Sequence, residues 1–193
     1  MLQTAANLVS HVGAWNSKDR TASVEFANKV FEWGGVPQRA FTWQDVEAVF
    51  LTALNRNNAH GARMNSGWTK VAAFAASSLL HPAPLIIWDS RVAHSLISRI
   101  EAILIQNGIN AIPAYLNNIG SVPGRGGTRK NATYTLNWPN GYGRWNSVFA
   151  GSELVAEICH ELNARQTPCL SPDAQLVPWD VRSVEMVLFM DGY

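Results

Sequence analysis

The stretch that decides the fold reads Gly67-Trp68-Thr69-Lys70-Val71-Ala72-Ala73-Phe74 and continues, after a short break, as Leu85-Ile86-Ile87-Trp88-Asp89-Ser90-Arg91-Val92-Ala93. Its first part has the composition and apolar spacing of a helix, which we expect to run from about Gly67 to Leu80. Pro82 and Pro84 then break the chain, and the apolar residues 85–88 predict a short buried connector. An aspartate directly before a helical run is a favourable N-cap, so a further helix is expected over 89–106.

The sequence on both sides of this stretch is also mainly helical. Apolar spacing and end signals predict helices at about residues 3–14, 21–33, 43–55, 148–165 and 179–190. Residues 117–147 are different, because they mix Gly, Asn, Arg and aromatic residues without a period. This segment predicts a long functional loop with a short hairpin at 132–137. We therefore expect an all-α fold in one helical domain over 1–193.

The composition limits the class of protein. The chain has 193 residues, of which 47% are hydrophobic and 15% charged, so it can bury a core and is not of the disordered type. Its two cysteines form no CxxC pair, so we expect no zinc module, no metal and no cofactor. We see neither a signal peptide nor a membrane span, and therefore expect a cytoplasmic protein without a membrane partner.

The charge is unevenly distributed along the chain. The net charge is +1, yet between Glu47 and Glu153 nine basic residues face only two acidic ones, which gives this block a net charge of +7. A block almost free of carboxylates is typical of a surface that binds a polyanion such as DNA. The alternative is that the basic residues cluster in the sequence by chance and are distributed over the whole surface in the folded protein.

Lys70 and Asp89 are the candidate chemical groups. Lys70 is the only lysine between Lys29 and Lys130, and it lies among apolar residues whose burial would lower its pKa. A neutral amine can attack a sugar C1′ as a nucleophile, and a nearby carboxylate stabilises positive charge that develops on the sugar. The alternatives are ordinary: an aspartate that only caps a helix, and a lysine exposed to solvent.

The two quoted segments together resemble the helix-hairpin-helix DNA glycosylases, most closely the bacterial 8-oxoguanine glycosylase-like group. In that superfamily a Gly-x-x-Lys-Val-Ala segment opens the second helix of the hairpin, and an Asp starts the next helix after a buried turn. The separation of 19 residues between Lys70 and Asp89 matches the oxoguanine branch. The resemblance covers residues 43–96 and, more weakly, the closing run 184–190. The usual Leu-Pro-Gly-Val-Gly hairpin is absent, and His60 to Gly67 stand in its place.

The resemblance implies double-stranded DNA with a modified base as the partner, and it implies Lys70 as nucleophile and Asp89 as its electrostatic partner. Contacts to DNA are expected from the hairpin region and the loop over 117–147, namely from Arg63, Gly67, Arg125, Arg129, Lys130 and Arg144. Base-flipping enzymes also need aromatic side chains that stack the extruded base. The candidates for this pocket are Trp68, Trp88, Trp138, Tyr142 and Trp145, although most tryptophans belong to a protein core.

These observations predict a DNA glycosylase, with possible lyase activity at abasic sites, that acts near the bacterial nucleoid. 8-Oxoguanine is the first substrate that the resemblance suggests, and another modified or hypermodified viral base is an alternative. A catalytically silent helix-hairpin-helix DNA-binding module would explain the charge pattern equally well. A small-molecule lyase with a Schiff-base lysine is a further alternative, and it predicts no affinity for DNA.

Overall fold

The computed structural model describes residues 1–37, 40–78, 84–124, 134–171 and 173–192. The described chain is mostly helical, which confirms the all-α class. Its α-helices are α1 (Leu2–Val9), α2 (Ser17–Trp33), α3 (Trp43–Asn55), α4 (Ser66–Ser77), α5 (Ser90–Gln106), α6 (Trp145–Ala164) and α7 (Val181–Asp191). A 3₁₀-helix, η1 (Ala114–Leu116), and two short antiparallel strands, β1 (Cys169–Leu170) and β2 (Leu176–Val177), complete it.

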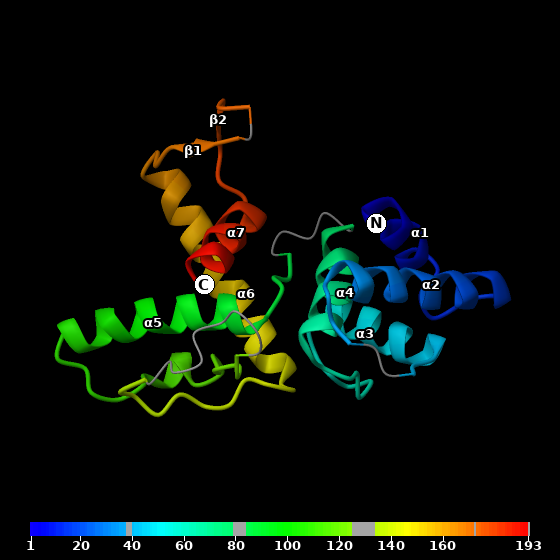
Figure 1. Ribbon diagram of the computed structural model, residues 1–193, viewed down its shortest axis with the longest axis horizontal. Coiled ribbons are helices and arrows are strands. Elements are labelled where there is room, and N and C mark those ends of the chain that lie inside the picture. Colours follow the sequence, from blue (N-terminus) through cyan, green and yellow to red (C-terminus); the bar gives the residue numbers. More distant parts are fainter. Residues whose placement is uncertain (38–39, 79–83, 125–133, 172, 193) are drawn as a thin grey trace.

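The helices form two groups, which lie on opposite sides of Figure 1. In the first group α4 packs against α1, α2 and α3, and in the second α7 packs against α5 and α6. The connector between α4 and α5 passes from one group to the other. It brings the start of α5 close to the helix that carries Lys70.

Side-chain caps explain where the important helices begin. The Asn65 side chain accepts hydrogen bonds from the backbone of Gly67 (2.8 Å) and Trp68 (3.0 Å), so α4 starts at Ser66. α2 begins at Ser17, four residues before the predicted start, because Asn16 forms a capping box with Asp19. The first predicted helix, in contrast, ends at Val9 and is followed by turns.

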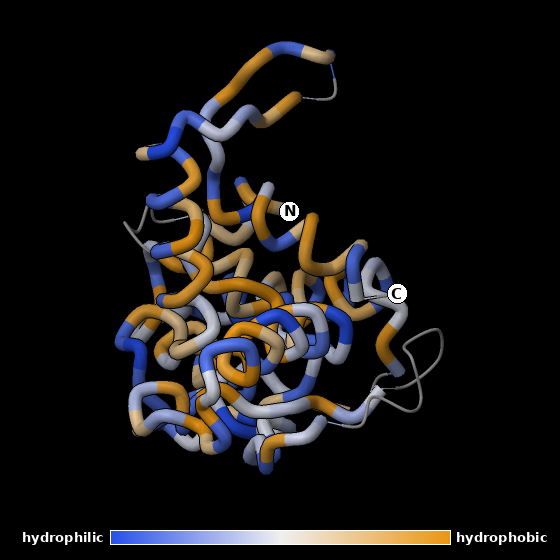
Figure 2. The backbone as a smooth tube through the Cα atoms, turned by 90° about the vertical axis from the view of Figure 1, so that its left-hand side faces the viewer, coloured by the Kyte–Doolittle hydropathy of each residue, from blue (hydrophilic) through white to orange (hydrophobic). Residues whose placement is uncertain are grey.

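The core continues from one helical group into the other. Phe50, Leu85, Ile86 and Trp88 are completely buried and belong to one continuous hydrophobic cluster with residues of both groups. Figure 2 shows hydrophobic and hydrophilic stretches alternating along the chain. The indole N–H of Trp145 on α6 donates to the Ala62 carbonyl of the α3–α4 loop at 3.0 Å. The two groups are therefore held together by buried side chains and by specific hydrogen bonds.

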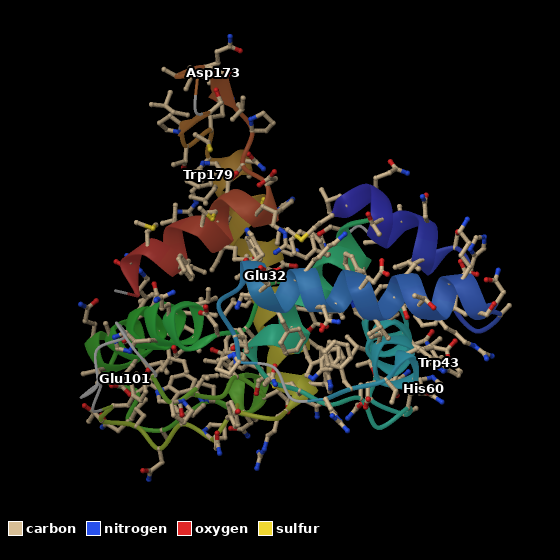
Figure 3. The ribbon with its side chains drawn as sticks, turned by 45° about the vertical axis from the view of Figure 1, so that its right-hand side comes forward. Glu32, Trp43, His60, Glu101, Asp173 and Trp179 are labelled. Atoms are coloured by element: carbon tan, nitrogen blue, oxygen red, sulfur yellow. The ribbon has the colours of Figure 1, made fainter. Side chains whose placement is uncertain are left out.

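The described part of the predicted loop is anchored by one buried carboxylate. Glu101 of α5 accepts hydrogen bonds from the backbone N–H groups of Thr135 (2.8 Å) and Leu136 (2.9 Å) and from the Trp138 indole (3.0 Å). Figure 3 shows Glu101 on α5, which lies above this segment in that view. The hairpin expected at 132–137 is wrong over its described residues, 134–137, which form no strand; the N–H groups of Thr135 and Leu136 bond to Glu101 instead.

The strands β1 and β2 form a small arm that the sequence did not predict. In Figure 3, Asp173 marks its tip and Trp179 its base. Trp179 fixes the arm to α6, since its backbone N–H donates to Asn163 at 2.8 Å and its indole donates to the Thr167 carbonyl at 3.0 Å. None of the helices that the structure describes combines the length and apolar character needed to cross a membrane.

Candidate active site

A cleft of about 1530 Å³ lies between the two helical groups. Its walls come from the end of α2, the start of α4, the start of α5 and one face of α7. Three ionisable side chains that line it, Lys70, Asp89 and Glu185, are almost completely buried. The cleft therefore brings together an amine and two carboxylates whose side chains are largely shielded from solvent.

Lys70 lies in the second turn of α4 and is only 8% exposed. Its Nζ donates to the Ser66 carbonyl at 3.3 Å, so the side chain extends back toward the start of its helix. Gly34, after the end of α2, makes room for it: a Cβ there would lie 2.7 Å from Lys70 Cδ and 2.9 Å from Cε.

Burial lowers the pKa of Lys70 from its ordinary value of 10.5. The nearby Arg91 guanidinium lowers it further, whereas the negative charges of Asp89 and Glu185 oppose the shift. Desolvation is the largest of these effects, and its result is that the neutral amine is easier to form than in an exposed lysine.

Asp89 is the N-cap of α5, as the sequence predicted. Its Oδ1 accepts hydrogen bonds from the backbone N–H groups of Arg91 (3.0 Å) and Val92 (3.1 Å). These bonds and the positive end of the helix dipole stabilise a negative charge on the carboxylate. Because Asp89 also lines the cleft and acts electrostatically on Lys70, the cap is at the same time part of the site.

Glu185 is a site residue that the sequence reasoning missed. It lies on α7, is 6% exposed, and its Oε2 accepts hydrogen bonds from Arg182 and from the Ile87 backbone at 3.3 Å. Burial raises the pKa of Glu185 to about 7, with a smaller contribution from Asp89, despite the opposing effects of Arg182 and the Ile87 N–H group. The sequence held one signal for it: Glu185 is the only charged residue in the closing run 184–190.

Aromatic side chains form one wall of the cleft. The Trp68 ring packs edge-on against Phe31 and Phe41, with both centroid distances at 5.0 Å. Tyr142 and Trp33 also line the cleft and are 45% and 57% exposed, so their rings are accessible from solvent. Two of the predicted pocket residues, Trp68 and Tyr142, are thus in the cleft wall.

The other three predicted pocket tryptophans lie in the core and do not line the cleft. Trp88 is fully buried, and its ring lies so close to Gly151 that a Cβ there would collide with it. The indole of Trp138 points inward to Glu101, and that of Trp145 is bonded to the α3–α4 loop. These three rings are therefore enclosed by protein and are not among the residues that line the cleft.

The predicted DNA contacts have different outcomes. Arg63 lines the cleft, where it pairs with Asp45 at 3.1 Å, and Arg144 is exposed just before α6. Gly67 is buried against the Phe31 ring, and its N–H donates to the N-cap side chain of Asn65. The remaining predicted contacts, Arg125, Arg129 and Lys130, lie outside the described residues.

The described residues hold no cluster of three or more His, Cys, Asp or Glu side chains suited to a metal ion. What the cleft offers is an amine with a lowered pKa, a capped carboxylate and a second carboxyl group that titrates near neutral pH. This combination suits nucleophilic attack on an electrophilic carbon with charge stabilisation nearby. The chain matches no family model, no curated protein and no solved structure.

Proposed function

We propose that the protein is a DNA N-glycosylase in which the Lys70 amine attacks C1′ of a nucleotide that carries a modified base. One observation carries this proposal: the buried Lys70, with a lowered pKa, lines the same cleft as the helix-capping carboxylate of Asp89. A surface lysine would be almost fully protonated at neutral pH and could not attack. Burial removes part of that barrier.

Asp89 has the electrostatic role. Departure of the base builds positive charge on the sugar, and a carboxylate fixed by two backbone N–H groups stabilises that charge without having to reorganise. Its cap geometry keeps it at the start of α5, so it cannot turn away from the cleft without opening the helix end.

The reaction balances without an added cofactor. The lone pair of Lys70 Nζ forms a bond to C1′, while the glycosidic bond breaks and its electron pair leaves with the base, which takes up a proton. Ring opening converts the product into a protonated Schiff base. In this proposal the Asp89 carboxylate takes the C2′ proton, and the resulting enamine expels the 3′-phosphate with the electron pair of the C3′–O bond, which cleaves the strand. Water then hydrolyses the Schiff base, which returns Lys70 as the amine and leaves an unsaturated aldehyde on the sugar.

The aromatic lining of the cleft and the charge distribution along the sequence support DNA as the substrate. Its wall offers exposed aromatic rings, Tyr142 and Trp33, on which an extruded base could stack. The sequence block between Glu47 and Glu153 carries a net charge of +7, which favours a polyanion. In this proposal α3, the loop 56–65 and α4 act as the helix-hairpin-helix element, and 8-oxoguanine is the first base to test.

The test is covalent trapping. The protein is incubated with duplex oligonucleotides that carry 8-oxoguanine, another modified base or an abasic site, and borohydride then reduces any Schiff base to a stable adduct. We expect an adduct for the natural protein and none for Lys70→Gln. Lys29→Gln is the matched control, because Lys29 is an exposed lysine on α2 and should leave adduct formation unchanged.

The same assay separates the alternatives. No adduct with any of these DNAs, together with tight and salt-dependent binding, would replace the proposal by a DNA-binding module without catalysis. Neither an adduct nor DNA binding would point to a small-molecule substrate. An adduct that persists in Lys70→Gln would exclude Lys70 as the nucleophile.

A further inference from the structure

The guanidinium of Arg182 joins three parts of the molecule. Arg182 lies on α7 and its Nη1 donates to Glu185, one turn further along that helix. Its Nη2 donates to the Leu85 carbonyl in the connector, to the Ala73 carbonyl of α4 at 3.3 Å and to Ser77 Oγ of α4 at 3.0 Å. A single side chain thereby links α7 to the helix that carries Lys70.

Glu185 holds the connector at a second point. Its Oε2 accepts the Ile87 backbone N–H at 3.3 Å, and Ile87 precedes Asp89 by two residues. α7 therefore binds the connector on both sides of residue 86, through the carbonyl of Leu85 and the N–H of Ile87.

We propose that Arg182 and Glu185, here called the α7 clamp, are positioning residues that fix the Asp89 carboxylate relative to the Lys70 amine. The proposal rests on the function proposed above. Lys70 and Asp89 belong to different helical groups, so neither helix alone sets the distance between them. The clamp is the set of hydrogen bonds that ties the Lys70 helix and the Asp89 connector to one common element.

The chemistry of the clamp favours positioning over simple stability. The Glu185 side chain is buried and that of Arg182 is 36% exposed, so the attraction between them is offset by desolvation on one side and weakened by solvent on the other. Glu185 is 6% exposed and interacts with charged groups from each neighbouring element: Arg182 on α7, Lys70 on α4 and Asp89 at the start of α5. The pair provides directional hydrogen bonds to four partners on α4 and the connector. They are the Ala73 and Leu85 carbonyls, Ser77 Oγ and the Ile87 N–H group.

The first test is kinetic and uses the full chain with the best trapped substrate. Misplacing a reacting group by about 1 Å costs on the order of 100-fold in rate, so we expect Arg182→Gln and Glu185→Ala to lower kcat by about that factor with KM unchanged. Glu185→Gln should restore kcat to within a few-fold, because both bonds use the one oxygen Oε2, which an amide oxygen can replace. The control is Arg165→Gln, which breaks the exposed Arg165–Glu161 pair on α6.

The second test needs no DNA. Competitive acetylation with acetic anhydride, followed by peptide mass spectrometry, measures the reactivity of Lys70 against pH in each folded variant. Glu185→Ala and Glu185→Gln both remove the charge that acts on Lys70, but only the alanine removes the hydrogen bonds of the clamp. Loss of the clamp should therefore give Glu185→Ala a different pH midpoint of Lys70 acetylation from Glu185→Gln, whereas Arg165→Gln should keep the midpoint of the natural protein. This readout keeps the clamp testable even if no substrate is found, because it reports only on the surroundings of Lys70.

The outcomes are distinct. If the natural protein forms no adduct but the Lys70 midpoint differs between Glu185→Ala and Glu185→Gln, the proposed function fails and the clamp stands as a device that positions Lys70. If Arg182→Gln and Glu185→Ala stay folded with unchanged kcat, and Glu185→Ala has the same midpoint as Glu185→Gln, the clamp proposal is overturned. The same holds if KM rises while kcat does not fall, since that pattern belongs to substrate binding.

Discussion

Replacing Glu185 by Gln should change how the stability of the protein depends on pH. In the folded protein the pKa of Glu185 is raised from 4.5 to about 7, chiefly by burial. An acid with a raised pKa in the folded state holds its proton more tightly when folded, so its favourable contribution is complete below pH 4.5. That contribution is lost as the pH rises through 7, because ionisation then places a buried negative charge in the fold.

The size of the effect follows from the pKa shift. One pKa unit corresponds to about 1.4 kcal/mol, so the contribution of Glu185 should fall by roughly 3 kcal/mol between pH 4 and pH 8.5. Glutamine cannot ionise but keeps the hydrogen bonds to Ile87 and Arg182. We therefore expect Glu185→Gln to be about as stable as the natural protein at pH 4, and more stable by roughly 3 kcal/mol at pH 8.5.

Urea unfolding of both proteins at several pH values between 4 and 8.5 measures this difference. Glu157→Gln, at an exposed glutamate of α6, is the matched control and should show no such trend. Repeating the comparison with Lys70→Met in both proteins removes the coupling between Glu185 and the lysine. The reasoning is refuted if the stability difference is constant across this range or if the variant loses stability relative to the natural protein as the pH rises.

Three further changes test the site and its support. Gly34→Ala should keep the fold but lower the rate of adduct formation at least ~10-fold, because the new Cβ displaces the Lys70 side chain. Gly108→Asn, at a position with φ of 72° and open space that does not line the cleft, is the control and should leave the rate unchanged. Arg91→Gln should raise the pKa of Lys70 and so move the pH midpoint of adduct formation upward, and an unchanged or lower midpoint would contradict this. Glu101→Gln should lower the free energy of unfolding by about 2–3 kcal/mol in urea titrations, because an amide group accepts the three N–H donors less well than a carboxylate does. A loss below about 0.5 kcal/mol would exclude an anchoring role for Glu101.

The sequence predicted those parts of the fold that depend on residues close together in the chain, such as helix N-caps and apolar periodicity. Helices α3 and α5 begin where Thr42 and Asp89 predict their N-caps, and apolar periodicity located α6 and α7 within a few residues. The start of α2 was missed because its first turn is polar, and only the Asn16 capping box, a local feature too, would have indicated it. The β1–β2 arm was missed because two-residue strands have no measurable alternation.

The site was predictable in so far as it depends on residues close in sequence. Lys70 and Asp89 became candidates because their spacing of 19 residues resembles that of the oxoguanine branch and because each is isolated among apolar residues. Glu185 could not be found in this way, because its partner Ile87 is 98 residues away. The loop tryptophans show the same limit: polar neighbours suggested exposed rings, but Trp138 turns inward to a carboxylate on α5, which no local pattern encodes.

The two candidate groups have opposite relations to helix starts, and this connects the fold to the chemistry. The positive end of a helix dipole favours a negative charge and opposes a positive one. Asp89 is the N-cap of α5, and two backbone N–H groups of that helix start donate to its Oδ1. The Lys70 side chain instead runs back along α4, where its Nζ donates to the Ser66 carbonyl. Burial is the main cause of the lowered pKa of Lys70, and Arg91 in the first turn of α5 acts in the same direction. The start of α5 thus brings to the cleft both the Asp89 carboxylate and a guanidinium that makes it easier for Lys70 to lose the proton that the proposed attack requires it to lose.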